Sequence, residues 1–334
     1  MTGRATASAI IVNWNGAEHL RTCLPSLREQ SYEPLEIVVV DNASSDGSRE
    51  VAERHGARWL PLKQNMGLAP ALNRGAASAR GELLLFVNND MRFDRDFVAH
   101  LADMLEADGD IFAADGRQYN WEGSAVGHAA TRLSRRRPDG TTSVELVPGL
   151  YFYQQPSAEQ TDVFMASAAS MLVQRKKFEA LGGCDERLPR GYEDAEICWR
   201  AWLRSWRVVY APGAVCWHRV GASGRSREGA RRNFRGILRG RLLLATKLLP
   251  ARYATGAWMV SAAGLARDLG RMRPGDAADR LAVLFASARE MPRLLRERWS
   301  LFDSAGTTPG KHLKRMLRLT LEDEDGRAAR NSSH

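Results

Sequence analysis

The chain contains 334 residues, of which 44% are apolar, and it carries a net charge of +9. This length is typical of about two domains, and the apolar content excludes a wholly disordered protein. Residues 1–9 lack the features of a signal peptide, and no apolar run reaches the roughly 18 residues that would cross a bilayer. We therefore expect a cytoplasmic protein whose four cysteines stay reduced, because none forms a Cys-x-x-Cys pair.

Strands and helices alternate through the first 107 residues. Short apolar, β-branched runs predict buried strands, and the segments between them have the apolar spacing of helices. The expected strands are 8–14, 35–40, 58–62 and 83–87, and the expected helices are 17–30, 48–55, 69–79 and 97–107. Alternation at these lengths predicts an α/β fold with a mostly parallel, twisted, Rossmann-like sheet flanked by helices.

The second half of the chain has a less regular pattern. Residues 110–162 are expected to be irregular, with some strands and a surface loop. Beyond them the pattern predicts a buried strand at 166–173, helices at 176–181 and 194–205, and strands at 207–210 and 214–218. From 228 to 300 the pattern becomes helical, and residues 321–334 are expected to form a flexible tail.

Basic charge gathers near the C-terminus. Residues 219–300 contain 18 Lys and Arg and only 6 Asp and Glu, interleaved with apolar residues in amphipathic helices. Two interpretations stay open: peripheral contact with anionic lipids on the inner face of a membrane, or packing against the rest of the chain or a second copy in a homodimer. Nucleic-acid binding is not expected, because basic charge alone is nonspecific.

Carboxylates follow two of the predicted strands. Asp41 directly follows the strand at 35–40, and Asn88-Asn89-Asp90 follows the strand at 83–87. Parallel α/β sheets bind ligands outside the carboxyl ends of their strands, so these side chains are expected to border a cleft. Asp41 can accept a hydrogen bond from the imide of a uracil or thymine ring, or it can be a turn residue or N-cap. Asp46 fits the turn and cap role better.

Asp90 is a candidate ligand for Mg²⁺ or Mn²⁺, which bind few protein carboxylates together with phosphate and water oxygens. His218, at the end of a predicted strand, is a candidate second ligand. The alternative for a lone histidine after an apolar run is a structural role. Asp194 lies near the start of a predicted helix, where the dipole favours an ionised carboxylate. It can act as a general base or simply cap the helix.

Several segments, taken in order, resemble the inverting family 2 of glycosyltransferases, and most closely its rhamnosyltransferase-like branch. The resemblance covers residues 7 to about 223. It rests on seven segments: Ile-Ile-Val-Asn-Trp-Asn (10–15), Val-Val-Asp-Asn-Ala-Ser-Ser-Asp-Gly-Ser (39–48), Asn-Met-Gly-Leu-Ala-Pro-Ala-Leu-Asn-Arg-Gly (65–75), Phe-Val-Asn-Asn-Asp (86–90), Leu-Gly-Gly-Cys-Asp-Glu (181–186), Gly-Tyr-Glu-Asp-Ala-Glu-Ile-Cys-Trp-Arg (191–200) and Trp-His-Arg-Val-Gly-Ala-Ser (217–223).

The resemblance implies a GT-A fold, a nucleotide-sugar donor, a divalent cation (Mg²⁺ or Mn²⁺) and roles for individual residues. Asp194 matches the catalytic base, and Asp90 and His218 match metal ligands. The positions that match the donor site are Asn13, Asn15, Asp41, Asn65, Gly67, Asn73, Asn88, Asn89 and Asp90. Two positions depart from the family: Asn88 replaces the first acid of the Asp-x-Asp motif, and Cys184 replaces an aromatic residue.

The predicted function is therefore an inverting hexosyl transfer from dTDP-rhamnose or a UDP-sugar to a hydroxyl of a glycan, a lipid-linked glycan or a small molecule. Two other functions stay open: a non-catalytic sugar-nucleotide-binding or scaffold protein on the same fold, and a nucleotidyltransferase. The predicted domains are a GT-A catalytic domain and a basic helical extension. The catalytic domain is 1–225, with a nucleotide-sugar half at about 1–110 and an acceptor half at about 111–225, and the extension is 226–320.

Overall fold

The computed structural model describes residues 4–139, 143–189, 191–219 and 227–318. The chain divides into two compact units, of which the first contains residues 1–130 and 156–220 and the second contains residues 131–155 and 221–334. The boundary predicted at residue 225 and the tail predicted at 321–334 lie outside the described residues.

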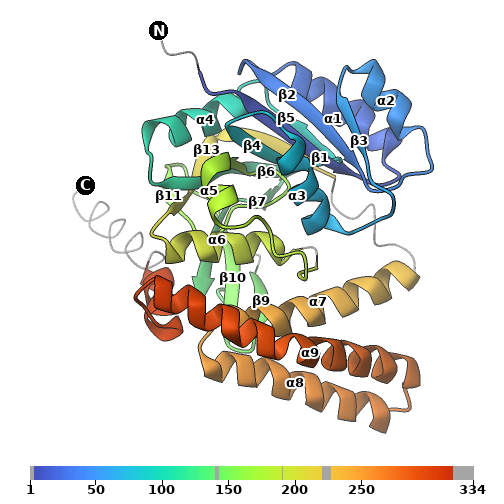
Figure 1. Ribbon diagram of the computed structural model, residues 1–334, viewed down its shortest axis with the longest axis vertical. Coiled ribbons are helices and arrows are strands. Elements are labelled where there is room, and N and C mark those ends of the chain that lie inside the picture. The colour runs from blue at the N-terminus through green and yellow to red at the C-terminus, as the bar shows by residue number, and fades with distance from the viewer. Residues whose placement is uncertain (1–3, 140–142, 190, 220–226, 319–334) are drawn as a thin grey trace. The chain divides into compact units, whose positions relative to one another are not determined.

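A ten-stranded mixed sheet forms the centre of the first unit (Figure 1). Its order is β11-β13-β6-β12-β4-β1-β2-β3, while β5 pairs with β13 and β7 pairs with β6. Strands β3, β2, β1 and β4 are parallel, whereas β12 is antiparallel to β4 and β6. The strands are β1 (Ala7–Asn13), β2 (Leu35–Asp41), β3 (Arg58–Pro61), β4 (Leu83–Asn88), β5 (Met91–Phe93), β6 (Ile111–Asn120), β7 (Val126–His128), β11 (Thr161–Asp162), β12 (Leu172–Gln174) and β13 (Arg207–His218).

Helices cover both faces of this sheet, which is why its central strands are apolar throughout. They are α1 (Ala17–Arg28), α2 (Ser48–Arg54), α3 (Leu68–Ser78), α4 (Phe97–Ala107), α5 (Arg175–Ala180) and α6 (Glu193–Leu203). Ala9 and Ile11 of β1 belong to a core with residues of α1, α2 and α4. Ile10 faces α3, where a Cβ on Gly75 would lie 2.3 Å from Ile10 Cγ2. Gly75 therefore allows α3 to pack this closely on the sheet.

Two sequence-based assignments in the second half are wrong in detail. The strand predicted at 166–173 is only β12, because the amides of Ser170 and Met171 donate back to Ser167 O in a turn. The strands predicted at 207–210 and 214–218 form one strand, β13, with a register shift between Ala211 and Val215. The segment 110–162 contains strands, as expected, and begins with the ten-residue strand β6.

The second unit contains a small sheet of order β8-β10-β9 and the predicted C-terminal helices. The strands are β8 (Ala130–Ser134), β9 (Ser143–Val147) and β10 (Leu150–Gln155), and the helices are α7 (Arg227–Leu248), α8 (Ala251–Gly270) and α9 (Pro274–Ser304). All three helices pack on one another. None of the described helices combines the length and apolarity needed to cross a bilayer. All four cysteines are free and buried.

A buried ion pair within α6 is expected to contribute strongly to stability. Arg200 Nε and Nη2 each lie 2.7 Å from an oxygen of Glu196, and both side chains are almost fully buried. Glu196→Gln leaves the guanidinium buried without its counter-charge, so we expect a loss of about 3–5 kcal/mol in unfolding free energy. Urea unfolding followed by circular dichroism measures this loss.

The matched control is Glu53→Gln, which breaks an exposed pair with Arg49 at the same four-residue spacing. An exposed pair of this kind contributes about 0.3–0.5 kcal/mol. Equal losses for Glu196→Gln and Glu53→Gln would contradict the structural role of the buried pair.

Asp279 of α9 predicts a pH dependence in the second unit. Its buried carboxylate lies 2.8 Å from Arg231 and also contacts Arg235, and these hydrogen bonds lower its pKa to about 2. A lowered folded-state pKa gives stability that is present above pH 4 and is lost as the pH falls through about 2. We expect Asp279→Asn to lower the Tm at pH 7 and the difference from wild type to shrink towards pH 2.

Differential scanning calorimetry from pH 7 to pH 2 measures these differences. Asp276→Asn, at an exposed position of the same helix, is the control and should change Tm less at pH 7. A Tm difference for Asp279→Asn that stays constant down to pH 2 would contradict the assignment.

Candidate active site

Six of the predicted donor-site residues lie at or just after the carboxyl ends of three adjacent strands: Asn13, Asn15, Asp41, Asn88, Asn89 and Asp90. In the register of the sheet Val12 pairs with Asn88 of β4, and Asn13 pairs with Asp41 of β2. The turn of Asn89 and Asp90 follows directly. The structure therefore brings these polar side chains to one edge of the sheet, as expected for parallel strands.

Asn13 connects the three strand ends. Its amide donates to Ser44 Oγ at 3.2 Å and lies 3.5 Å from Asp41 Oδ1, while its Oδ1 accepts from Asn89 Nδ2 at 2.8 Å. Asn15, in the left-handed region with φ 49°, accepts from Ser45 N at 2.8 Å and donates its own N–H to Ser44 Oγ. Asn13, Asn15 and Asp41 thus belong to one hydrogen-bonded group.

Asp41 and Asp46 play different parts in the turn after β2. Asp41 Oδ2 accepts from Ser44 N at 3.0 Å, and its side chain is buried. Asp46 accepts from Ala17 N at 3.0 Å and from Ser48 N at 3.2 Å, so it holds the first residues of both α1 and α2. Burial raises the pKa of Asp46, but the bonds from Ser48 and Ala17 outweigh that effect and lower it. Asp46 is the structural residue of the two.

Asn42 is a residue that the sequence analysis missed. Its amide donates to Gly67 O at 3.0 Å, and its oxygen accepts from Met66 N at 2.8 Å. These bonds fix the turn before α3, in which Asn65 Oδ1 accepts from Gly67 N. Gly67 has φ +91°, so any side chain there would be strained. The signal in the sequence was the position of Asn42, directly after Asp41.

Asn73 lies apart from this group. Its side chain forms two hydrogen bonds of 2.9 Å with the main chain of Cys184 and a third of 3.0 Å with Glu186. A Cβ on Gly183 would lie 2.6 Å from Asn73 Oδ1, so the turn needs glycine there. Asn73 therefore ties α3 to the 183–186 turn.

Asp90 and His218 come together at the junction of β5 and β13. His218 pairs with Met91 in the antiparallel register of these strands, and its Nε2 lies 3.2 Å from Asp90 Oδ1. Both side chains are largely buried, yet His218 Nε2 makes no hydrogen bond to any described residue. Asp90 Oδ1 and His218 Nε2 are therefore close enough to bind the same cation, and no hydrogen bond between these two atoms competes with it.

The protein ligands at this point are few. Among the described residues no group of three or more His, Cys, Asp and Glu side chains is placed to hold a metal ion. Two ligands fit Mg²⁺ or Mn²⁺ that takes its other ligands from phosphate and water, and they do not fit a closed structural site.

The arginine and tryptophan residues that flank Met91 and His218 in the sequence form a stacked cluster with Trp121. The Arg92 guanidinium lies 4.5 Å from the ring centre of Trp217 and 5.1 Å from that of Trp121, and the Arg219 guanidinium lies 4.3 Å from the Trp121 ring. Stacked guanidinium groups keep their N–H donors free for phosphate oxygens. The sequence analysis did not select these arginines.

Asp194 lies in the first turn of α6 and is buried. Its carboxylate accepts from Ala195 N at 2.8 Å and from Ala168 N at 3.4 Å. Burial raises the pKa of Asp194, while these N–H groups and the neighbouring His128 limit the rise. Burial and the Asp194 carboxylate also raise the pKa of Glu193. The environment therefore favours one negative charge on the pair.

The segment that contacts Asp194 is held by Asp115, a second residue that the sequence analysis missed. Asp115 accepts from Ser167 N at 2.7 Å, from Ser170 Oγ at 2.8 Å and from His128 Nε2 at 2.8 Å. The sequence carried a signal: Asp115 follows the apolar run 111–114, as Asp41 and Asp90 follow theirs.

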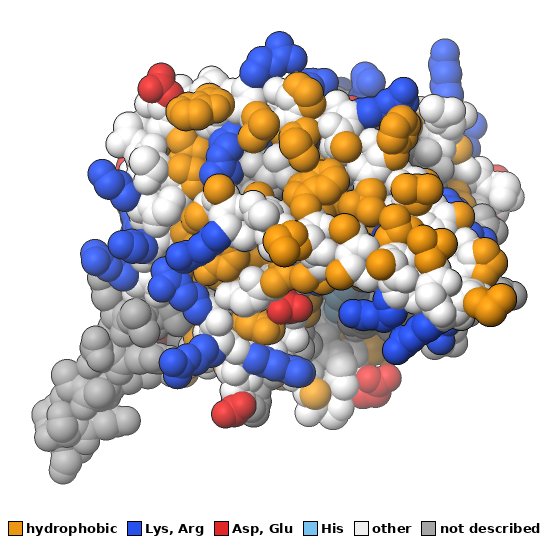
Figure 2. Space-filling view, turned by 90° about the horizontal axis from the view of Figure 1, so that it is seen from below, with side chains coloured by type: hydrophobic (Ala, Val, Ile, Leu, Met, Phe, Trp, Pro, Cys, Tyr) orange, Lys and Arg blue, Asp and Glu red, His pale blue; other side chains and the backbone are white. Residues whose placement is uncertain are grey.

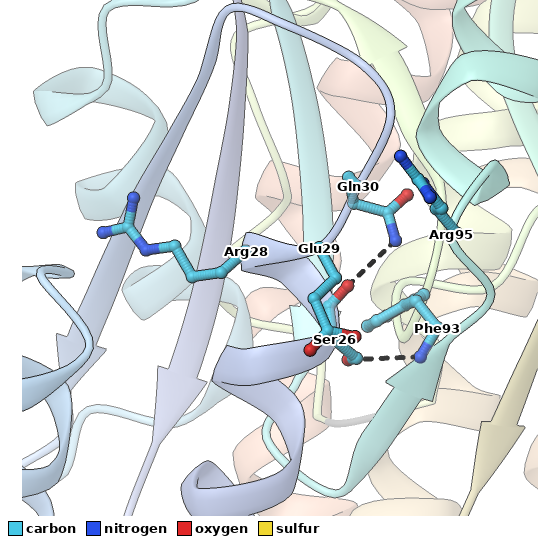
Figure 3. Close-up of a pocket in the computed structure, with 6 residues that line it drawn as sticks. All are labelled: Ser26, Arg28, Glu29, Gln30, Phe93 and Arg95. Atoms are coloured by element: carbon cyan, nitrogen blue, oxygen red, sulfur yellow. Dashed lines mark hydrogen bonds between the residues drawn. The ribbon is translucent and has the colours of Figure 1, made fainter.

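A cavity elsewhere in the first unit is separate from these residues. It has a volume of about 380 Å³, and Figure 3 shows its lining at the C-terminal end of α1 and around Phe93 and Arg95. Its polar groups bond to one another: Gln30 donates to Ser26 O at 2.9 Å, and Ser26 Oγ accepts from Phe93 N at 3.2 Å. None of the predicted site residues lines this cavity, and its hydrogen bonds are structural.

Comparisons with known proteins agree with this geometry. The protein EpsH of Bacillus subtilis strain 168 is 34% identical over 107 residues, which are 31% of this chain and 30% of EpsH. The N-acetylglucosaminyl-diphospho-decaprenol L-rhamnosyltransferase of Mycobacterium tuberculosis H37Rv is 28% identical over 243 residues, which are 65% of this chain and 77% of that protein. This chain thus spans under a third of EpsH and about three quarters of the rhamnosyltransferase.

A solved structure shares the fold. GalNAc-T7, crystallised with UDP, GalNAc and Mn²⁺, matches with a TM-score of 0.57 and 18% identity, over 74% of this chain and 49% of GalNAc-T7. The mixed sheet with flanking helices is the GT-A fold. The profile of the family described as Glycosyl transferase family 2 matches residues 8–182, more than half of the chain. The chain therefore belongs to glycosyl transferase family 2.

Proposed function

We propose that this chain is an inverting glycosyltransferase that uses Asp194 as its general base and a divalent cation at Asp90. One observation carries the proposal: the base and the cation ligands border the same strand end. Asn88 N donates to Ala169 O at 3.2 Å, and the preceding residue, Ala168, donates to Asp194. Asp90 follows Asn88 by two residues, so a donor phosphate and an acceptor hydroxyl can be held side by side.

The donor is a nucleoside-diphosphate sugar bound across the ends of β1, β2 and β4. Asp41 accepts the imide N–H of a uracil or thymine ring, because a carboxylate has about four lone-pair sites and Ser44 uses only some of them. Asn13 and Asn15 border the nucleotide. Asn65, Gly67, Asn88 and Asn89 complete the donor-binding residues, while Asn73, which was predicted to belong to them, holds α3 to the 183–186 turn.

Asp90 and His218 hold Mg²⁺ or Mn²⁺. The cation supplies charge stabilisation for the departing diphosphate. Arg92 and Arg219, stacked on Trp121, are the sequence neighbours of Met91 and His218, and we assign them as N–H donors for phosphate oxygens. The protein groups thus provide the positive environment that a leaving nucleoside diphosphate needs.

The chemical step is a single displacement. Asp194 takes the proton of the acceptor hydroxyl as the acceptor oxygen forms a bond to the anomeric carbon. The bond from that carbon to the phosphate oxygen breaks on the opposite face, and its electron pair leaves with the nucleoside diphosphate. One displacement inverts the anomeric configuration. The raised pKa of Asp194 brings this base closer to neutral pH, where general-base catalysis is most effective.

We propose dTDP-rhamnose as the donor and a UDP-sugar as the second candidate. The name of the Mycobacterium tuberculosis relative, an L-rhamnosyltransferase that acts on a decaprenol-linked sugar, supports this choice. The acceptor is a hydroxyl of a glycan, a lipid-linked glycan or a small molecule. A lipid-linked acceptor favours peripheral membrane contact through the C-terminal helices.

Asp194→Asn is expected to lower the transfer rate by about a hundred- to ten-thousand-fold, the usual contribution of a general base. The amide keeps the shape of the side chain but cannot accept the proton. Nucleotide binding should be unchanged, because Asp194 lies outside the donor-binding group. The assay follows release of nucleoside diphosphate from dTDP-rhamnose and UDP-sugars with a panel of acceptors, and thermal shift measures nucleotide binding.

Glu193→Gln is the matched control, since Glu193 is the buried neighbour with the raised pKa. Glutamine resembles its protonated form, so transfer should persist. The base assignment is wrong if Asp194→Asn turns over near the wild-type rate or Glu193→Gln loses as much activity. Release of pyrophosphate in place of nucleoside diphosphate would indicate a nucleotidyltransferase.

Nucleotide binding is expected to depend on the cation. We expect dTDP or UDP with Mn²⁺ to raise the Tm more than either nucleotide alone, and more than GDP or CMP. Saturation at a hundred times Kd stabilises the folded state by about 2.7 kcal/mol. Asp90→Asn and His218→Ala should remove the Mn²⁺-dependent part of the shift, and Asp41→Asn should remove the preference for uracil and thymine nucleotides.

His100→Ala, at an exposed position on α4, is the control for His218→Ala and should behave as wild type. A Mn²⁺-dependent shift that survives both Asp90→Asn and His218→Ala would refute the cation site. No shift with any nucleotide would favour the scaffold function.

A further inference from the structure

Helices α8 and α9 expose an apolar surface. Seven large side chains on or beside them are more than half exposed: Met259 (66%), Val260 (51%), Leu269 (61%), Met272 (89%), Leu281 (57%), Phe285 (61%) and Trp299 (76%). Figure 2 shows hydrophobic side chains gathered in a band, with Lys and Arg side chains along its borders. Contiguous exposed apolar surface of this kind marks an interaction site.

The exposed residues form ordered stripes. On α9 the exposed positions 281, 285, 288, 292, 295 and 299 follow steps of three and four residues, which places them on one face of the helix. The buried Val283, Ser287 and Leu294 lie on the opposite face. On α8 no charged residue occurs between Arg252 and Arg267. Each helix therefore packs one face on the rest of the protein and leaves a second, apolar face exposed and able to bind a partner.

Charge at this surface is strongly one-sided. Between residues 251 and 304, seven arginines are exposed and only two acidic residues, Asp276 and Asp303, are exposed. Three of the other four acids form ion pairs: Asp268 with Arg280 at 2.9 Å, Asp279 with Arg231 at 2.8 Å and Glu297 with Arg293 at 3.0 Å. The face thus presents apolar side chains and positive charge together.

We propose that the α8–α9 face docks on the surface of an anionic lipid bilayer, with both helices lying in the plane of the membrane. Apolar side chains enter the acyl boundary, and the arginines reach the lipid phosphates with their stems along the apolar surface. Trp299 suits the interface, where aromatic rings are enriched. The Arg289 guanidinium stacks on the Phe285 ring, 4.7 Å from its centre. When Phe285 enters the bilayer, Arg289 is therefore placed to contact the lipid headgroups.

A bilayer suits this surface better than a second copy of the chain. A symmetric dimer through the same face would bring the seven arginines of each copy together, and like charges at an interface are costly. Nucleic-acid interfaces are polar as well as positive, whereas this face is apolar at its centre. Only an anionic, apolar partner matches both properties.

The biological role of this docking rests on the proposed function, because a lipid-linked acceptor would lie at the same membrane surface. The test of the docking itself needs neither a donor nor an acceptor. The full chain is sedimented with vesicles of phosphatidylcholine, with and without 30% phosphatidylglycerol. We expect binding to the anionic vesicles that weakens at 0.5 M salt, and little binding to neutral ones. Asp194→Asn should bind the vesicles as wild type, so failure of the catalytic proposal leaves this result intact.

We expect the double variant Phe285→Ser with Trp299→Ser to bind anionic vesicles at least tenfold more weakly. In the double variant Arg267→Gln with Arg271→Gln, the loss of each arginine should weaken vesicle binding roughly fivefold. The controls are Val144→Ser, at an exposed apolar position of β9, and Arg49→Gln with Arg54→Gln on α2, all of which should bind as wild type. These positions are exposed, so the variants should keep the wild-type Tm.

Brominated acyl chains should quench the fluorescence of Trp299, measured as the difference between wild type and Trp299→Phe. The proposal would be overturned if the chain did not bind anionic vesicles, or if the double variant Phe285→Ser with Trp299→Ser bound them as wild type does. It would also be overturned if light scattering showed a dimer that this double variant converted to a monomer without any change in vesicle binding. Binding of the face to a short DNA duplex but not to vesicles would also refute it.

Discussion

The parallel register of β4, β1 and β2 is the constraint on which the candidate site depends. It sets Asn13 opposite Asp41 and Val12 opposite Asn88. A shift of one residue in any pair would turn the polar side chain to the other face of the sheet. The apolar residues before these positions are buried on both faces, so the same burial that stabilises the sheet holds the site residues in place.

The antiparallel strand β12 gives the site its second half. It lies between β4 and β6, and the residues before it leave the sheet as a turn anchored by Asp115. Because the turn is anchored, Ala168 offers its N–H to Asp194 while Ala169 stays bonded to β4. The antiparallel strand β12 thus brings the start of α6, which is late in the chain, next to the end of β4, which is early in the chain.

Sequence patterns predicted the first half of the fold closely, since β1 to β4 and α1 to α4 follow simple periodicities. They failed at 166–173, where small apolar residues resemble a strand but a local turn and Asp115 compete for their amides. The strand β13 was divided in two because Pro212 and Gly213 interrupt its apolar pattern, although the strand continues through a register shift. The positions of the candidate residues Asp41 and Asp90 were predictable because strand ends are visible in sequence. The sequence also places Asn42 and Asp115 beside apolar runs, but their contacts are set by tertiary structure, so a local pattern does not reveal their partners.

The bonds of Asn73 have a consequence for how the two halves of the catalytic fold move. Asn73 belongs to α3, whose first turn follows Gly67, and its side chain is fully occupied by the main chain of Cys184 and by Glu186. A shift of α3 relative to the 183–186 turn would break all three of these hydrogen bonds. Two segments more than a hundred residues apart in sequence are therefore held together by a single asparagine.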